Sequence, residues 1–222
     1  IQADAQNRYP FAYYSGDRMG YAYATRSMEH EAKEAALRGN NRYFTRTVVP
    51  HELIPGHHLQ GFFADRHETQ RRHFGSSVLV EGWGFYTELL LDEQGYFRTP
   101  EERLGHLSWK LVRAARILVS VKYHLGRITQ EEMVRFLVDQ VGLEEAGAKA
   151  EVERYMTYSP LYQASYMIGA LAIRDLREEC RKAWGDRFTL YEFHRRLLEE
   201  NSIPIALIRY SLLDLEVPRN AR

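Results

Sequence analysis

The sequence has little of several features that identify common classes of protein. It has one cysteine, Cys180, so an internal disulfide is excluded, and this thiol lies in the charged stretch Arg-Glu-Glu-Cys-Arg-Lys. We therefore interpret Cys180 as a structural side chain and not as a nucleophile. No apolar run approaches the roughly 18 residues that a membrane-spanning helix needs, which predicts a soluble chain.

The sequence also lacks an excess of charge of either sign. Lys and Arg together number 30, as do Asp and Glu, so no overall field favours nucleic acid or an anionic membrane as a partner. The first residues do not form a signal peptide, and the chain does not begin with Met. We therefore interpret the chain as part of a longer protein or a processed form, and its terminus does not reveal the compartment.

What remains is the composition of a folded globular protein, with 45% hydrophobic and 27% charged residues. Residues 1–46 are rich in Tyr, Gly and Arg, which predicts an irregular segment with one short helix near residues 28–38. Over residues 47–222, apolar residues recur at helical spacing, which predicts a helical core with little or no sheet in a single domain. The predicted helical stretches are 59–64, 78–91, 104–125, 131–141, 149–156, 162–184 and 190–198.

Capping residues support these boundaries. Thr99 precedes Pro100 and two acidic residues, as an N-cap does, and Thr129 with Glu132 has the spacing of a capping box. Four helical stretches are followed by a glycine, the residue that most often ends a helix, at Gly95, Gly126, Gly142 and Gly185.

The most specific motif is His-Glu-Leu-Ile-Pro-Gly-His-His at residues 51–58. Zinc peptidases commonly place two histidines on one helix with a glutamate beside the first, and the usual histidine spacing is four. Here His57 is six residues after His51, about 240° around an unbroken helix, so the helix must break for both to bind one ion. The Pro-Gly pair between them predicts that break.

His58 is the alternative second ligand. It returns to the face of His51 but lies about 10.5 Å farther along an unbroken helix, which is a long reach for a shared ion. We therefore expect His57 to be the ligand and keep His58 as a neighbour or alternative.

A catalytic zinc site needs a third protein ligand and an open position for water. Glu81 lies in the apolar stretch Val-Leu-Val-Glu-Gly-Trp-Gly and needs a partner if it is buried, because an unpaired buried charge is costly. A metal ion is one such partner, and a salt bridge to arginine is the other. Glu88, two turns on, is expected behind the site or at the surface. With these ligands, Glu52 is the expected general base that takes a proton from water.

These residues resemble the bacterial DUF885 family, zincin-like proteins often described as proposed lipoproteins or as peptidases of unproven activity. The resemblance covers nearly the whole chain. It rests on residues 51–60 and 81–88, on Arg113-Ala-Ala-Arg116, His124, Arg154-Tyr155, residues 163–169 (Gln-Ala-Ser-Tyr-Met-Ile-Gly) and Phe193-His194. Family members are usually longer, so the resemblance implies a C-terminal catalytic part in the bacterial cytoplasm or in an exported, periplasmic protein. One departure is Ser120, where the family usually has Asp, which weakens the case for His124.

The family is similar to the gluzincin peptidases, which implies a multi-helical, gluzincin-like fold with a downstream glutamate as third ligand. The 24-residue step from His57 to Glu81 is like theirs and favours His57 over His58.

Further residues are candidates for contact with the substrate. A phenol that donates to the developing oxyanion is expected from Tyr166, with Tyr162 as its rival. Arg154 and Arg116 could bind a substrate carboxylate, or form buried salt bridges instead. His124 is either a further donor to the oxyanion or a side chain that holds a helix end.

The sequence therefore predicts a peptidase that holds one Zn²⁺ per chain and hydrolyses short peptides, as a carboxypeptidase or dipeptidase does. A metal-binding helical scaffold or a regulatory protein without activity is the alternative, although such a protein would not need Glu52. A di-iron protein is disfavoured, because its paired Glu-x-x-His motifs are absent. Manganese, cobalt or iron could use the same ligands.

Overall fold

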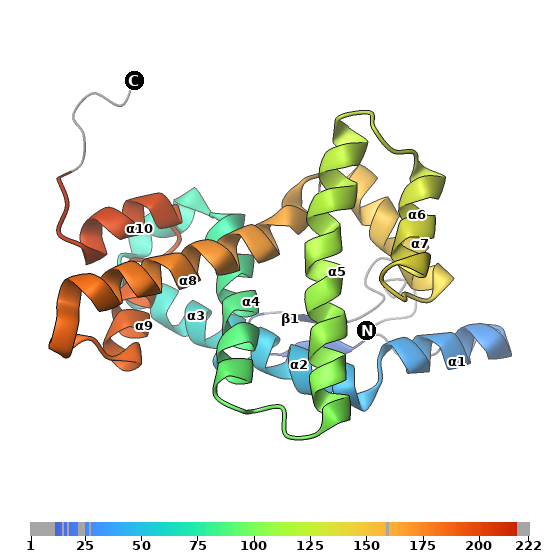
Figure 1. The fold of residues 1–222 in the computed structure, drawn as a ribbon, viewed down its shortest axis with the longest axis horizontal. Helices are drawn as coiled ribbons and strands as arrows, with labels where there is room; N and C mark the ends of the chain where they lie inside the picture. The colour runs from blue at the N-terminus through green and yellow to red at the C-terminus, as the bar shows by residue number, and fades with distance from the viewer. Residues whose placement is uncertain are drawn as a thin grey trace.

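The structure is a computed structural model that describes residues 12–14, 16, 18–21, 25–26, 28–158 and 160–216. Within these residues the fold is mainly α-helical, as predicted (Figure 1). The strands form one two-stranded antiparallel sheet, in which β1 (Ala12–Tyr14) pairs with β2 (Met19–Tyr21) and Tyr14 lies opposite Met19. No helix in these residues has both the length and the apolar character needed to cross a membrane.

The α-helices follow one another with short connections. They are α1 (His30–Gly39), α2 (Arg42–Glu52), α3 (His57–Ala64), α4 (Ser77–Glu93), α5 (Pro100–His124), α6 (Gln130–Asp139), α7 (Glu145–Glu153), α8 (Ser165–Trp184), α9 (Leu190–Glu199) and α10 (Ile205–Leu212). Shorter helical turns lie at Thr69–Phe74, Tyr162–Ala164 and Gly185–Arg187, and a π-helix spans Arg154–Tyr158.

The predicted caps are confirmed. The side chain of Thr99 accepts a hydrogen bond from the backbone N–H of Glu102, and Thr129 and Glu132 form the reciprocal bonds of a capping box. All four predicted helix-ending glycines have positive φ, from 54° at Gly185 to 80° at Gly142.

Two helix starts and one whole helix differ from the prediction. Helix α2 begins at Arg42 inside the segment predicted to be irregular, because the side chain of Asn41 accepts hydrogen bonds from the first backbone N–H groups of the helix. The predicted helix over residues 162–184 starts as a 3-10 turn and becomes α-helical at Ser165. Helix α10 was not predicted, and it lies beyond the last stretch in which helical spacing was identified, residues 190–198.

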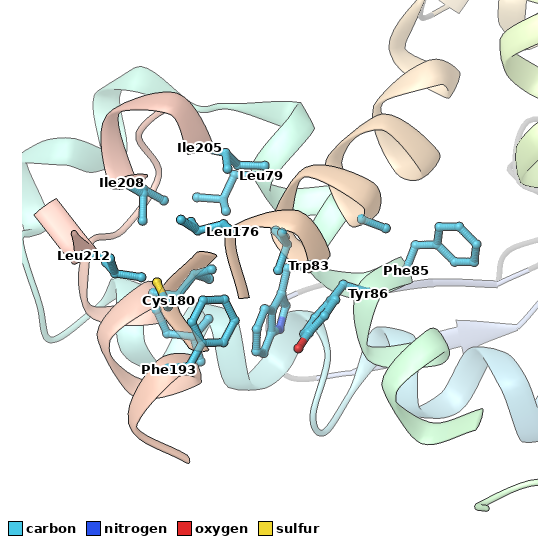
Figure 2. Packing of buried hydrophobic residues seen from close by; sticks show 14 of the residues in the cluster. Leu79, Trp83, Phe85, Tyr86, Leu176, Cys180, Phe193, Ile205, Ile208 and Leu212 are labelled. Carbon is cyan, nitrogen blue, oxygen red and sulfur yellow. The ribbon is translucent and has the colours of Figure 1, made fainter. Parts of the chain in front are cut away.

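Two hydrophobic clusters stabilise the fold, one that includes α4 and one that includes α5. The larger cluster joins α4 and α8 to α9 and α10, and Figure 2 shows Leu212 at one end of it and Phe85 at the other, with Trp83 and Tyr86 between them. Cys180 is fully buried in this cluster, as its structural interpretation requires. The smaller cluster joins α5 to α6, α7 and the π-helix around Met133 and Tyr155.

Helices α4 and α8 approach closely at Gly82 and Gly169. A Cβ atom added at Gly169 would lie 1.9 Å from the carbonyl oxygen of Val78 and 2.6 Å from the Cα atom of Gly82. Only glycine fits at this crossing, so the two glycines set the distance between the helix that carries Glu81 and the helix that carries Tyr166.

The substitution Gly169→Ala tests this packing. The added methyl group has no room, so we expect the free energy of unfolding to fall by about 2 kcal/mol or more in urea denaturation. The matched control is Gly61→Ala in α3, where the nearest atom to the new Cβ is 4.0 Å away. It should leave stability unchanged or raise it by up to about 1 kcal/mol. Equal effects of the two substitutions would contradict the close crossing.

Candidate metal centre

The turn between α2 and α3 brings His51 and His57 together. The backbone N–H of Gly56 donates to the carbonyl oxygen of Pro50 over 2.9 Å, which folds the chain back on itself. A Cβ atom at Gly56 would lie 1.7 Å from the carbonyl oxygen of His51, so the turn requires glycine. The imidazole centroids of His51 and His57 are 4.8 Å apart, with the rings nearly perpendicular. The helix break predicted from the Pro-Gly pair is confirmed.

Glu81 of α4 faces both imidazoles. Its Oε2 atom lies 3.6 Å from Nε2 of His51 and 3.4 Å from Nε2 of His57. One possible ligand atom from each of the three residues lies within 4.8 Å of the other two. Within the described ranges, no group donates a hydrogen bond to this buried oxygen. Two imidazole nitrogens and a carboxylate oxygen therefore converge on one point, as a metal site requires.

His58 points to a different partner. Its Nδ1 atom lies 3.0 Å from the hydroxyl oxygen of Tyr14 in β1. His57 has the supporting contact expected of a metal ligand, because its Nδ1 atom lies 3.4 Å from the side-chain oxygen of Gln60. The grouping with His51 and Glu81 thus includes His57 and not His58.

The Gly-Trp-Gly sequence after Glu81 fits α4 against this turn. A Cβ atom at Gly84 would lie 2.7–3.0 Å from ring atoms of His51, so the absence of a side chain at this position leaves room for the imidazole. The indole N–H of Trp83 donates to the carbonyl oxygens of Pro55 and Gly56, over 3.0 and 3.2 Å. Trp83 therefore fixes the start of α3, and with it His57, to the helix that carries Glu81.

Glu88 and Arg113 lie behind His51. The Oε1 atom of Glu88 is 2.7 Å from Nδ1 of His51 and accepts a hydrogen bond of 2.6 Å from the guanidinium of Arg113. All three side chains are buried. A carboxylate on the far nitrogen of an imidazole fixes its orientation and raises its basicity, which is the usual support for a metal ligand.

Opposite charges hold the three candidate ligand residues together. Burial alone would lower the pKa of His51, but the carboxylates of Glu81 and Glu88 outweigh it and raise the pKa to about 9. Burial would raise the pKa of Glu81, but the imidazoles of His51 and His57 hold it well below its usual range. A metal ion that binds here must displace the imidazole protons, so metal binding and protonation compete.

Glu52 follows His51 directly at the end of α2. Its side chain is buried, and burial raises the pKa of its carboxyl while the charges of His51 and His57 act in the opposite direction. The charge of Glu81 also acts on it, so Glu52 is a fourth ionisable group of the same cluster. Its role as general base stays a prediction.

Two tyrosines complete the cluster, Tyr162 in the 3-10 turn before α8 and Tyr166 in the first turn of α8. The hydroxyl of Tyr162 donates a hydrogen bond to Oε1 of Glu81, which leaves the other oxygen of Glu81 to face the imidazoles. The ring of Tyr166 stacks on that of His51, with centroids 6.0 Å apart. Burial first, and the charge of Glu81 second, raise the pKa of both phenols, so both keep their protons at neutral pH. The structure thus gives Tyr162 a direct contact with a ligand residue.

The two predicted substrate-binding arginines share one internal partner. The buried guanidinium of Arg116 donates to both oxygens of Glu151, over 2.8 and 2.9 Å. Arg154 donates to the same carboxylate over 2.9 Å, and so does the hydroxyl of Tyr155. The salt-bridge alternative is therefore the one found for Arg116. The side chain of Arg154 is 25% exposed, and its role toward substrate stays a prediction.

His124 lies apart from the candidate centre. Its Nε2 atom is 3.2 Å from the carbonyl oxygen of Tyr155, a contact that ties the end of α5 to the π-helix. It is eleven residues from Arg113, which corresponds to about 16 Å along the helix axis. The alternative that His124 holds a helix end is the one found. Ser120, one turn earlier, is buried and has no hydrogen bond among the described residues.

The sequence does not indicate that Arg113, Trp83 and Gly84 contribute to the site. The seven-residue spacing of Glu81 and Glu88 already places both carboxylates on one face of a helix, which was the available evidence for a shared role. Nothing in the sequence indicates which arginine pairs with Glu88, because that contact joins residues 25 positions apart.

The fold and site define a helical protein with a candidate metal centre of two histidines and a glutamate on α2, α3 and α4. The chain belongs to the DUF885 family, described as bacterial proteins of unknown function, whose model matches residues 1–212. No protein with a curated description matches the chain.

Two solved structures are similar to this fold. One is a proposed lipoprotein of unknown function from Shewanella oneidensis, with 28% identity over 92% of this chain and a TM-score of 0.78. The other is a proposed lipoprotein from Colwellia psychrerythraea, with 29% identity over 96% of this chain and a TM-score of 0.81. The present chain spans 39% and 37% of the lengths of these proteins.

Replacing Trp83 by Phe tests how the turn is held. Phe keeps the aromatic packing but removes the N–H donor, so His57 is less firmly placed and affinity for a divalent metal ion should fall roughly tenfold or more in a calorimetric titration. The matched control is Trp184→Phe, which removes a similar bond to the carbonyl oxygen of Leu212. It should leave metal affinity unchanged, and an equal loss in both variants would contradict the role of Trp83.

The pair between Glu151 and Arg116 should make stability depend on pH. Burial would raise the pKa of Glu151, but Arg116 and Arg154 outweigh it and lower the pKa from 4.5 to about 2. The stabilisation is therefore fully present above about pH 4.5 and is lost as the pH falls toward 2. Glu151→Gln should lower the free energy of unfolding by about 3–5 kcal/mol at pH 7.

The difference in unfolding free energy between Glu151→Gln and the unmodified chain should shrink as urea denaturation is repeated at successively lower pH below 4.5. Glu145→Gln, which removes only an exposed ion pair with Lys149, serves as the control and should change little at any pH. A difference for Glu151→Gln that stays constant down to pH 3 would contradict the assignment.

Proposed function

We propose that this chain is the catalytic part of a zinc-dependent peptidase that hydrolyses short peptides. The observation that carries the proposal is the Oε2 atom of Glu81, which is buried, faces Nε2 of both His51 and His57, and accepts no hydrogen bond from the described residues. A buried carboxylate oxygen without a donor is costly unless it is paired or binds a metal. Two imidazoles and one carboxylate are a donor set that suits zinc.

The number of candidate ligands and the position of Glu52 favour a catalytic site over a structural one. Three protein ligands leave a coordination position open, whereas structural zinc sites are usually closed by four. When bound, zinc would polarise a substrate carbonyl and make a water molecule more acidic. Glu52 lies beside the ligand residues, so its carboxylate would accept a proton from water and pass it to the leaving amine.

The tyrosines would act on the ligand set and on substrate. Tyr162 orients Glu81 by its hydrogen bond to Oε1. The phenol of Tyr166, beside the ring of His51, would donate a hydrogen bond to the carbonyl oxygen of the scissile peptide as negative charge develops there. A neutral donor suits this role, since both phenols keep their protons at neutral pH.

Arg154 supports a preference for short peptides with a free carboxylate. Its side chain is partly exposed, and its positive charge acts on both Tyr162 and Tyr166, so it lies near the candidate centre. A guanidinium there would bind the C-terminal carboxylate of a peptide, as a carboxypeptidase or dipeptidase requires. The description of both similar structures as lipoproteins favours an exported protein.

The substitution Glu52→Gln is the direct test of catalysis. It removes the proton acceptor but leaves the three ligand residues in place, so bound metal should stay near one ion per chain while kcat on a short-peptide library falls roughly 10²–10⁴-fold. Glu145→Gln, on the surface of α7, should change neither quantity. Unchanged turnover would remove Glu52 from the mechanism. If the unmodified chain bound metal but showed no activity, the alternative of a non-catalytic metal-binding scaffold would be favoured.

A further inference from the structure

One face of α5 carries a regular row of large apolar side chains that are exposed. The row, called here the α5 stripe, consists of Leu104, Leu107, Leu111, Leu118, Val121 and Leu125. Their spacing alternates between three and four residues, and Ala114 occupies the one remaining position. This is the a/d pattern of a coiled-coil heptad, and it extends from Leu104 to Leu125, the C-cap residue of the 25-residue helix α5.

The α5 stripe is not needed for the described core. The opposite face of α5 is the buried one, where Val112, Ala115 and Val119 pack inward and Arg113 and Arg116 form their internal pairs. In Figure 1, α5 passes in front of α2, and no other helix or strand covers its near side. A contiguous row of exposed leucines on a folded chain indicates an interaction surface.

The shape of the α5 stripe fits a helix. A strict a/d row is narrower than the apolar face of a helix that covers a globular core, and it matches the seam along which two helices pack at a crossing angle of about 20°. A sheet or an extended peptide would not match its length and spacing. The partner is therefore an α-helix with its own apolar seam.

The charges beside the α5 stripe determine which helix fits. The e and g positions of α5 contain three basic residues, Arg103, Lys110 and Lys122, and one acidic residue, Glu101, which precedes the stripe. In the part of the chain that the structure describes, no acidic side chain lies within ion-pair distance of these three. In a pair of two α5 helices, the g residues Arg103 and Lys110 would face Ser108 and Ala115 if the helices were parallel, and other g residues if they were antiparallel. None of these is acidic, so a second copy of α5 gives Arg103 and Lys110 no partner of opposite charge. A partner with Glu or Asp at its flanking positions would neutralise them.

We propose that the α5 stripe docks an amphipathic α-helix with acidic flanks that comes from outside residues 1–222. The similar structures have more than half of their length outside the part matched by this chain, and that additional polypeptide is the source we assign to the helix. Arg113, on the inner face of α5, donates a hydrogen bond to Glu88. Docking of a helix on α5 would therefore also restrict the motion of the side chains behind His51. The proposal does not depend on the proposed peptidase activity.

Designed helical peptides test the proposal directly. Two fluorescent peptides of about four heptads both have Leu at every a and d position. The acidic peptide has Glu at every e and g position, and the basic peptide has Lys there. We expect the 222-residue chain to bind the acidic peptide at least about tenfold more tightly than the basic one, with a difference that shrinks as salt is added. Fluorescence anisotropy measures both affinities.

Matched leucine variants localise the binding. Leu111→Ser with Leu118→Ser removes two positions that are 46% and 51% exposed, and should weaken acidic-peptide binding by at least about tenfold without unfolding the chain. The control pair, Leu37→Ser with Leu207→Ser, alters leucines that are 48% and 46% exposed elsewhere and should not weaken it. Equal binding of the two peptides, no binding of the acidic one, or equal losses in both variant pairs would overturn the proposal. So would a dimer of the chain in sedimentation that the α5 stripe variants dissociate.

Discussion

The rest of the site depends on one constraint, which is that the buried Oε2 atom of Glu81 has no hydrogen-bond donor and must be compensated by the groups it faces. Two imidazoles are brought to it by a turn that only glycine permits at position 56. The other oxygen of Glu81 is held by the hydroxyl of Tyr162. The carboxylates of Glu81 and Glu88 raise the pKa of His51 to about 9, so a positive charge on His51 lies opposite the carboxylate of Glu81. A metal ion would supply the same compensation with more specific geometry.

Close helix packing makes this arrangement possible. Gly82 and Gly169 let α4 and α8 approach until backbone meets backbone, and Gly84 leaves space for the ring of His51 against α4. Because Tyr162 lies in the turn that leads into α8 and Tyr166 in its first turn, the same crossing that builds the larger core also places both phenols near Glu81. Packing and site geometry therefore share the same three glycines.

Local patterns in the sequence predicted much of this structure. Helical spacing and caps located most helices, and the motif spacing predicted both the break before His57 and its grouping with Glu81. What could not be predicted depends on contacts between distant residues. The sequence left open whether Arg116 binds substrate or glutamate, and only the fold shows that Glu151 lies against it. The role of Trp83 likewise depends on carbonyl oxygens 27 and 28 positions away.

The central claim is that His51, His57 and Glu81 together hold one metal ion, and elemental analysis of protein purified without chelators tests it most directly. The account predicts about one zinc per chain, lost in His51→Ala, His57→Ala and Glu81→Ala and retained in His58→Ala. Circular dichroism would confirm that each variant is folded. If metal were lost in His58→Ala and retained in His57→Ala, the assigned ligand set would be contradicted. A chain that binds no metal even after zinc is added would contradict the metal centre itself.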